Sequence, residues 1–489
     1  MLFNSVPFLM FFPAVLLIHF ALPHRVRHVW LLAASYYFYM CWNPAYALLM
    51  LFSTAVTYAS GLLIARTQSV RGRKGWVALS FVINLGILFF FKYFNFAAQS
   101  LAAALAPMGI SWEAPAIDVL LPIGISFYTF QALGYTVDVY RGRMEAEKNF
   151  LRYALFVSFF PQLVAGPIER SENLLRQLNE KRPFNADNFK KGAMFMLWGY
   201  FMKMVIADRA AILVDHVYGD PLAYGGYSLV VATAVFAIQI YCDFGGYSAI
   251  AIGASQMLGV DLMQNFRQPY FAVSVSDFWR RWHISLSTWF RDYLYIPLGG
   301  NRKGVVRKYL NLLITFVLSG LWHGANWTYV IWGALNGVFQ IIGDLKNRVL
   351  KKWPVPCVKR DCFSYRLFQR IVTFVLIGLT WVFFRAESLD HAMQIFGQMF
   401  SVHNPWVFVD GSLYNLGLNR LEMQILLVSI GVLLAVDIAH EHGVSLRERL
   451  DDQNRLFRWL ACIAAIVVIL IFGVYGVGFD AAQFIYFQF

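Results

Sequence analysis

The sequence predicts an all-α protein that crosses a membrane many times. Its 489 residues are 59% hydrophobic and only 14% charged, whereas soluble domains carry about 25% charged residues. Apolar runs recur along the whole chain, and several approach the roughly 20 residues that a helix needs to cross a bilayer. We therefore expect a polytopic integral membrane protein with about twelve spans, formed by 1–489 as a single membrane domain.

Each expected span is an apolar run bounded by polar or charged residues. The runs lie at 6–22, 29–42, 45–65, 76–96, 119–140, 192–206, 226–252, 309–322, 327–345, 368–385, 421–438 and 458–476. The first run follows no basic stretch and precedes no small-residue cleavage site. It is therefore expected to be a span and not a removed signal peptide.

The net charge of +13 predicts the orientation of the chain. If the N-terminus lies outside, 36 of the 41 Lys and Arg residues fall in the alternating inner loops. Inner loops of membrane proteins are enriched in these residues, so both termini are expected outside the cytoplasm. This distribution is a topology signal and not a nucleic-acid surface. It requires that 153–166, with Pro161 in its middle, does not cross and forms a re-entrant hairpin.

Two polar segments break the pattern of spans and short loops. The inner segment 261–308 is rich in Trp, Tyr and Arg, which a plain solvated loop would not be. We expect it to form re-entrant or amphipathic helices that dip in from the cytoplasmic face and carry His283 inward. In the outer segment, 388–400 has helical periodicity. It either lies along the outer interface or packs on the bundle.

His323 lies between two apolar runs, at 309–322 and 327–342. A charge at membrane depth costs at least a few kcal/mol, and ionisable residues there are usually functional. Forty residues upstream, His283 lies among aromatic and cationic side chains. Together they indicate proton-transfer chemistry within the membrane.

Several motifs occur in one order over nearly the whole chain. They are 122-PIGISFYTFQALGYTVDVYRG-142, 161-PQLVAGPIER-170, 240-IYCDFGGYSAIAIG-253, 277-DFWRRWHISLSTWFRDYLYIPLGGNRKG-304, 319-SGLWHGANWTYVIWGALNG-337 and 484-FIYFQF-489. This set resembles the membrane-bound O-acyltransferase (MBOAT) family, in its branch of bacterial alginate-type polysaccharide O-acetyltransferases. The resemblance implies a ring of about 11–12 transmembrane helices, with re-entrant or amphipathic helices, around a funnel and a central tunnel.

The resemblance also implies an activity in the bacterial inner membrane. Acetyl would enter from cytosolic acetyl-CoA, a substrate and not a bound cofactor, and leave on an exported polysaccharide such as alginate. A separate SGNH-type transferase at the outer face would complete the reaction. Two alternatives stay open: D-alanyl transfer to teichoic acid from a carrier protein, and a polytopic transporter or flippase.

In this family the histidine that matches His323 is catalytic, and the one that matches His283 is a second important histidine. Acyl transfer to a hydroxyl needs a base and a donor for the developing oxyanion, and neutral imidazole suits the first task. We therefore expect His323 to be the base and His283 a polariser, proton partner or tunnel-positioning group. The plainer alternatives are a hydrogen-bonded core histidine at 323 and packing of His283 against Trp279 and Trp282.

Further polar residues are expected to support the site. Asn326 would share a helical face with His323, and Asp243 lies at membrane depth, either functional or satisfied by a nearby Arg or Tyr. The phosphates of coenzyme A would meet cations at the cytoplasmic mouth, although the same cations suit inner-leaflet lipid. These cations are Arg280, Arg281, Arg302 and Lys303. No metal site is expected, because Cys357 and Cys362 have no nearby histidine.

The tail 484–489 carries four aromatic residues in six positions. It resembles an aromatic C-terminal motif of this branch, in which the tyrosine is implicated as an acyl relay. Tyr486 would then accept acetyl in the tunnel and pass it to the extracytoplasmic partner. The alternative is an interfacial anchor.

Overall fold

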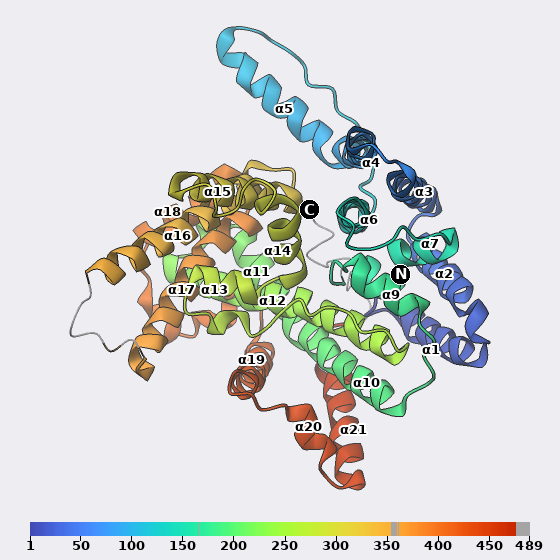
Figure 1. Cartoon of the computed structure of the whole chain (residues 1–489). Helices are drawn as coiled ribbons and strands as arrows, with labels where there is room; N and C mark the ends of the chain where they lie inside the picture. Colours follow the sequence, from blue (N-terminus) through green and yellow to red (C-terminus); the bar gives the residue numbers. More distant parts are fainter. Residues whose placement is uncertain (165, 354–358, 360, 476–489) are drawn as a thin grey trace. The chain divides into compact units, whose positions relative to one another are not determined.

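The computed structural model describes residues 1–164, 166–353, 359 and 361–475 (Figure 1). In these residues the regular elements are all helices, which confirms the all-α prediction. Seven helical segments of the described part are long and apolar enough to cross a membrane. They are Pro44–Arg66, Val70–Met108, Gly226–Met257, Val305–His323, Phe363–Arg385, Arg420–Glu441 and Arg455–Phe472. The protein is therefore a polytopic integral membrane protein.

The helices fall into two compact units. The first comprises residues 1–193 and 251–263, and the second comprises 194–250 and the described residues from 264 onward. Both α10 (Ala186–Tyr200) and α12 (Gly226–Met257) contribute residues to each unit. The predicted ring and tunnel involve both units and stay a prediction.

The first unit holds the helices of the N-terminal part of the chain. They are α1 (Val6–Ala21), α2 (His24–Met40), α3 (Pro44–Arg66), α4 (Val70–Leu88), η1 (Phe89–Tyr93), α5 (Phe94–Leu105), η2 (Ala106–Met108), α6 (Ile125–Tyr140), α7 (Phe150–Ser158), α8 (Phe160–Leu163) and α9 (Ser171–Asn179). The nine residues of α7 reach only about 14 Å, half of the roughly 30 Å of a bilayer core. This agrees with the prediction that 153–166 does not cross.

The second unit holds the remaining helices. Its first part contains η3 (Phe201–Ala207), α11 (Asp208–Gly219), η4 (Pro221–Ala223), most of α12, η5 (Pro269–Phe271), α13 (Val275–Arg281), α14 (Ile284–Phe290) and η6 (Arg291–Tyr295). Its second part contains α15 (Val305–His323), α16 (Trp327–Lys352), α17 (Phe363–Arg385), α18 (Leu389–Ser401), η7 (Pro405–Phe408), η8 (Ser412–Asn415), α19 (Arg420–Glu441), α20 (Leu446–Asp451) and α21 (Arg455–Phe472).

The two unusual polar segments fold as helices. Segment 261–308 contains the short helices α13 and α14, as expected, and both bury aromatic side chains. In the segment expected outside the cytoplasm, α18 buries Ala392, Ile395 and Met399. Ile395 and Met399 belong to the hydrophobic core of the second unit, so α18 packs on the bundle.

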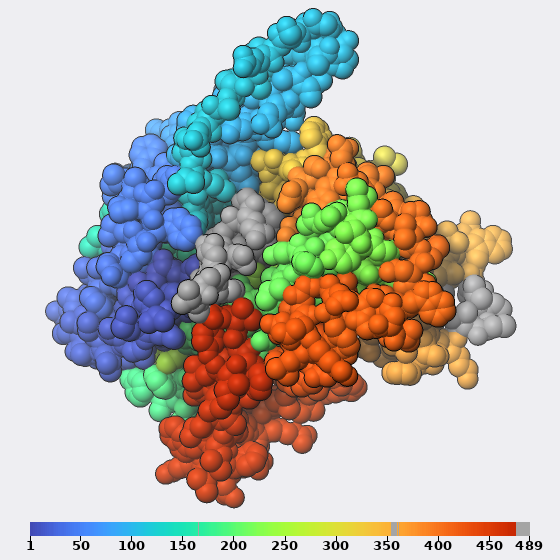
Figure 2. All heavy atoms as spheres, turned by 180° about the vertical axis from the view of Figure 1, so that it is seen from behind, coloured from blue at the N-terminus to red at the C-terminus, as the bar shows by residue number. Residues whose placement is uncertain are grey.

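Helix α21 exposes a large apolar surface. In α21, Ile469 is the buried residue, and large apolar side chains such as Leu456, Trp459 and Ile471 are exposed. This helix lies at the surface of its unit (Figure 2, red). An exposed surface of this apolar character suits a helix bathed in hydrocarbon.

Helices α15 and α16 form a hairpin that comes unusually close at two glycines. The Cα of Gly333 would lie 3.2 Å from a Cβ on Gly320, and that Cβ would collide with the backbone carbonyl of Tyr329. A Cβ on Gly333 would collide with the carbonyl of Phe316 in the same way. Small residues let backbones approach in membranes, where burial of apolar surface does not itself drive helices together.

We expect Gly320→Ala to destabilise the second unit by about 1–3 kcal/mol, because the added methyl group forces the hairpin open. Gly343→Ala in α16 is the matched control, since nothing lies within 4 Å of its added Cβ and alanine favours a helix. Thermal unfolding of the detergent-solubilised variants measures both effects. Equal melting temperatures for the two variants would show that the crossing tolerates a side chain.

Candidate active site

Two buried histidines face each other in the second unit. His323 is the last residue of α15, and His283 is the residue directly before α14. Their ring centroids lie 6.3 Å apart, with the ring planes inclined at 60°. His283 is fully buried, and His323 is 4% exposed. The fold therefore brings together two ionisable side chains that are 40 positions apart in the sequence.

The end of α15 places His323. Gly324 is extended (φ −156°, ψ 148°) and terminates the helix. The His323 ring then packs edge-on against Trp332, at 5.1 Å between centroids, and against Phe384, at 5.4 Å. These aromatic neighbours come from α16 and α17, so three helices define the position of the imidazole.

A strained backbone places His283. Its φ of 43° and ψ of 55° put it in the left-handed region. Among the described non-glycine residues, Gln268 is the only other one with a positive φ. Such a conformation costs on the order of 1–3 kcal/mol and collects at functional sites. Here it turns the chain between α13 and α14 and brings the ring against Phe244, at 4.7 Å between centroids.

Asn265 orients the His283 ring, and the sequence did not single it out. Its Oδ1 lies 3.4 Å from His283 Nδ1 and accepts a hydrogen bond from Ser285 Oγ at 2.6 Å. Its Nδ2 donates to Ser248 Oγ at 2.9 Å, which fixes the amide with its oxygen toward the ring. This favours a proton on Nδ1 and leaves Nε2 as the atom with the lone pair.

Burial controls the protonation of His283. Removal from water lowers the pKa of this imidazole to about 3, because desolvation penalises the charged form. The residue lies outside the helices long enough to span the membrane. At neutral pH it is therefore uncharged, and it can act as an acceptor or a donor of hydrogen bonds.

A cavity of about 410 Å³ lies among α13, α14, α15 and α16. Its lining includes Arg280, Arg291, Trp279 and Gln340, together with several hydroxyl side chains. Trp279 also packs on Trp332, at 5.6 Å between centroids, and Trp332 in turn contacts His323. The volume lies within the range of about 300–1,000 Å³ that is typical of small-molecule sites.

Comparison with known proteins places this geometry in a family. The model of the membrane-bound O-acyltransferase family matches residues 146–389, which include both histidines. The chain is 42% identical over 405 residues to the probable alginate O-acetylase AlgI of Pseudomonas syringae pv. tomato, covering 82% of this chain and 75% of that protein. The chain belongs to the membrane-bound O-acyltransferase family. It is therefore an O-acyltransferase, and membership does not favour the transporter or flippase alternative.

Two further MBOAT relatives cover most of the chain. The probable alginate O-acetylase AlgI of Azotobacter vinelandii is 40% identical over 446 residues, with 90% of this chain and 84% of the relative covered. The peptidoglycan O-acetyltransferase of Helicobacter pylori is 34% identical over 429 residues, with 81% and 79% covered.

The four cations expected at the donor site of this MBOAT protein have different surroundings. Arg280 lines the cavity. Arg281 forms ion pairs with Glu441 at 2.7 Å and with Asp277 at 3.2 Å. Arg302 and Lys303 are exposed in the loop before α15, outside the cavity lining. Their roles toward a donor stay predictions.

Asn326 and Asp243 have structural partners. Asn326 caps α16 by accepting from Thr328 N at 3.0 Å and donates from Nδ2 to the Glu387 carbonyl at 2.9 Å. The expectation that it shares a helical face with His323 is wrong, because α15 ends before it. Asp243 lies 2.6 Å from the Nζ of buried Lys203, so its charge is satisfied by a lysine where an Arg or Tyr was expected.

Two positions singled out in the sequence lie outside the described residues. Tyr486, with the rest of 484–489, is one of them, and Cys357 is the other. The acyl-relay role of Tyr486 stays a prediction.

We expect Asn265→Asp to change the pH dependence of the reaction. The carboxylate keeps an acceptor oxygen toward His283 and adds a negative charge, which raises the pKa of the imidazole. The acidic limb of the kcat–pH profile should therefore move to higher pH. Asn265→Leu should lower kcat by about tenfold or more, since it removes the orienting acceptor from a group whose acid–base contribution is about 10²–10⁴-fold.

The matched control is Asn84→Leu, which removes a buried amide of the first unit that donates to the Ser80 carbonyl at 2.8 Å. An Asn265→Asp profile that coincides with the wild-type profile would show that Asn265 does not act through His283.

Proposed function

We propose that this MBOAT enzyme moves an acetyl group from a thioester to a hydroxyl, for the O-acetylation of an exported polymer. The observation that carries the proposal is the buried His283–His323 pair, with ring centroids 6.3 Å apart. Each side chain supplies one of the two groups that acyl transfer needs, a base for the hydroxyl proton and a hydrogen-bond donor for the developing oxyanion.

His323 is the proposed base. The acceptor hydroxyl gives its proton to the imidazole while its oxygen attacks the acetyl carbonyl carbon. The carbon–sulfur bond then breaks, and the departing thiolate takes the proton. His283 polarises the carbonyl or passes the proton. The proposal requires one reacting oxygen to come within hydrogen-bond reach of both rings, whose centroids are 6.3 Å apart.

Acetyl-CoA is the proposed donor, and it is a substrate and not a resident cofactor. The cavity among α13–α16 supports this assignment, because Arg280 and Arg291 stand at a site of suitable volume. Guanidinium groups bind phosphate oxygens through charge-assisted, often paired hydrogen bonds. Trp279, in the wall of this cavity, connects the donor site to the histidines through Trp332.

The relatives support a polysaccharide acceptor. Those named above are called alginate O-acetylases and a peptidoglycan O-acetyltransferase. We therefore propose O-acetylation of an exopolysaccharide such as alginate, from the bacterial inner membrane with both termini outside. A separate SGNH-type enzyme would complete the transfer, with Tyr486 as the relay. D-alanyl transfer is less supported, because the teichoic acid D-alanyltransferase of Bacillus subtilis is 27% identical over 49% of this chain, against 42% over 82% for the alginate O-acetylase of Pseudomonas syringae.

We expect His323→Ala to lower acetyl transfer by about 10²–10⁴-fold, since the positioned base is lost. The assay follows loss of the acetyl-CoA thioester in proteoliposomes that contain the acceptor. His403→Ala is the control for loss of a histidine, because His403 is exposed and far along the chain from the site. A folded His323→Ala protein within tenfold of the wild type would rule out the proposed base.

We expect Arg280→Gln to raise the KM for acetyl-CoA by about tenfold and leave kcat nearly unchanged, because a phosphate contact is lost in ground state and transition state alike. Arg302→Gln is the control, since that side chain is exposed outside the cavity. Steady-state kinetics at varied acetyl-CoA distinguish the two. An unchanged KM in Arg280→Gln would show that Arg280 in this cavity does not contact the donor.

A further inference from the structure

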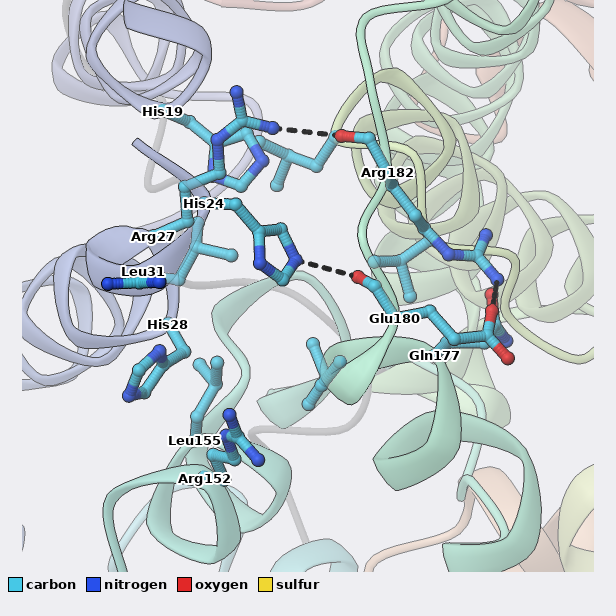
Figure 3. Close-up of a pocket in the computed structure, with 14 residues that line it drawn as sticks. His19, His24, Arg27, His28, Leu31, Arg152, Leu155, Gln177, Glu180 and Arg182 are labelled. Atoms are coloured by element: carbon cyan, nitrogen blue, oxygen red, sulfur yellow. Dashed lines mark hydrogen bonds and ion pairs between the residues drawn. The ribbon is translucent and has the colours of Figure 1, made fainter. Parts of the chain in front are cut away.

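The first unit contains a second cavity, of about 140 Å³, with strongly cationic walls (Figure 3). Three histidines and four arginines line it, and Glu180 is the one carboxylate among the lining residues. With the histidines neutral, four positive charges face one negative charge. The proposed acetyl transfer makes no use of this site.

The tight connection between α1 and α2 builds one wall of this cavity. The first helix ends at Ala21, the second begins at His24, and both contribute cavity residues. The segment after α9 forms another wall. His24 Nε2 donates to the Glu180 carbonyl at 2.9 Å, and Arg27 Nη1 donates to the Arg182 carbonyl at 2.8 Å (Figure 3). These hydrogen bonds therefore hold the two walls of the cavity together.

The charge of Arg27 is held in place and is not neutralised. Besides the Arg182 carbonyl, its guanidinium donates to the carbonyls of Leu22 at 3.0 Å and Phe20 at 3.3 Å. Carbonyl oxygens fix its orientation but carry no net charge. In the described residues, Arg25, Arg27 and Arg152 form no ion pair, whereas Arg182 is paired with Glu180 at 2.9 Å.

His19 supplies an independent sign of a binding site. It is only 6% exposed and lines the cavity, yet its Nδ1 has no hydrogen-bond partner among the described residues. A buried polar atom without a partner costs about 1–3 kcal/mol. A ligand oxygen in the cavity would satisfy this nitrogen and meet the arginine charges at the same time.

We propose that this cavity binds a phosphate group. Phosphate oxygens match the shared chemistry of the site, because they accept from guanidinium and imidazole N–H groups and balance an excess of positive charge. Anionic lipids provide such groups at basic pockets between membrane helices, and Leu17 and Ile18, beside His19 on α1, are exposed as lipid-facing residues would be. A free phosphate compound offers the same group from water.

The test uses the full-length protein in a neutral detergent and three probes: dioctanoyl phosphatidylglycerol, inorganic phosphate and dioctanoylglycerol, which lacks phosphate. Calorimetry measures binding to the wild type and to Arg25→Gln/Arg152→Gln. We expect saturable binding of phosphatidylglycerol that weakens at least about tenfold in the double variant, because two contacts to a charged group are lost. His19→Phe, which keeps an aromatic ring and removes the nitrogen, should also weaken it.

The matched control is Arg66→Gln/Arg71→Gln, which removes the same charge from exposed positions of the same unit outside the cavity. Competition by inorganic phosphate would assign the site to any phosphate group, and its failure to compete would assign the site to a lipid headgroup. The proposal is overturned if dioctanoylglycerol binds as tightly as phosphatidylglycerol, if no phosphate probe binds, or if the cavity and control variants lose equal affinity.

Discussion

The close approach of α15 and α16 is the constraint on which the histidine site depends. Gly320 stands three residues before His323, and Gly333 directly follows Trp332, so the crossing point sets these two side chains together at 5.1 Å. In lipid, helices gain no hydrophobic energy by associating, and close van der Waals contact must hold them. A bulkier residue at the crossing would move His323 and the aromatic wall together.

Aromatic packing connects this crossing to α17 and α13. Trp332 stacks on Trp381 at 5.8 Å and an angle of 22°, and it contacts Trp279 of α13. The helices α13 and α14 have seven residues each, too short to be stable alone. Their buried aromatic side chains therefore hold the strained turn at His283, and Asn265 then sets the direction of its ring. The strain is sustained by tertiary packing and not by local propensity.

The sequence predicted what depends on composition and local pattern. Long apolar runs located the helices, and the two histidines stood out because charge is costly in a membrane. Asn265 was missed because its importance lies in contacts with Ser248, His283 and Ser285 that no local pattern encodes. Arg280 and Arg281 are adjacent and of one type, yet neighbours on a helix point in different directions, so one lines the cavity and the other pairs with Glu441.

Buried ionisable groups of the second unit have two kinds of surroundings. Lys203 is 2% exposed and lies 2.8 Å from Asp208 and 2.6 Å from Asp243, so its charge is met by opposite charges. Aromatic rings pack against both histidines, and the amide of Asn265 contacts His283. Burial favours the neutral imidazole at His283. Neutral imidazole suits the proposed acyl transfer, which needs no net proton: when an alcohol and a thioester become an ester and a thiol, the proton released by the hydroxyl is the proton the sulfur requires. In the proposed mechanism an imidazolium exists only between these two transfers, so the proton taken from the hydroxyl is passed on to the sulfur.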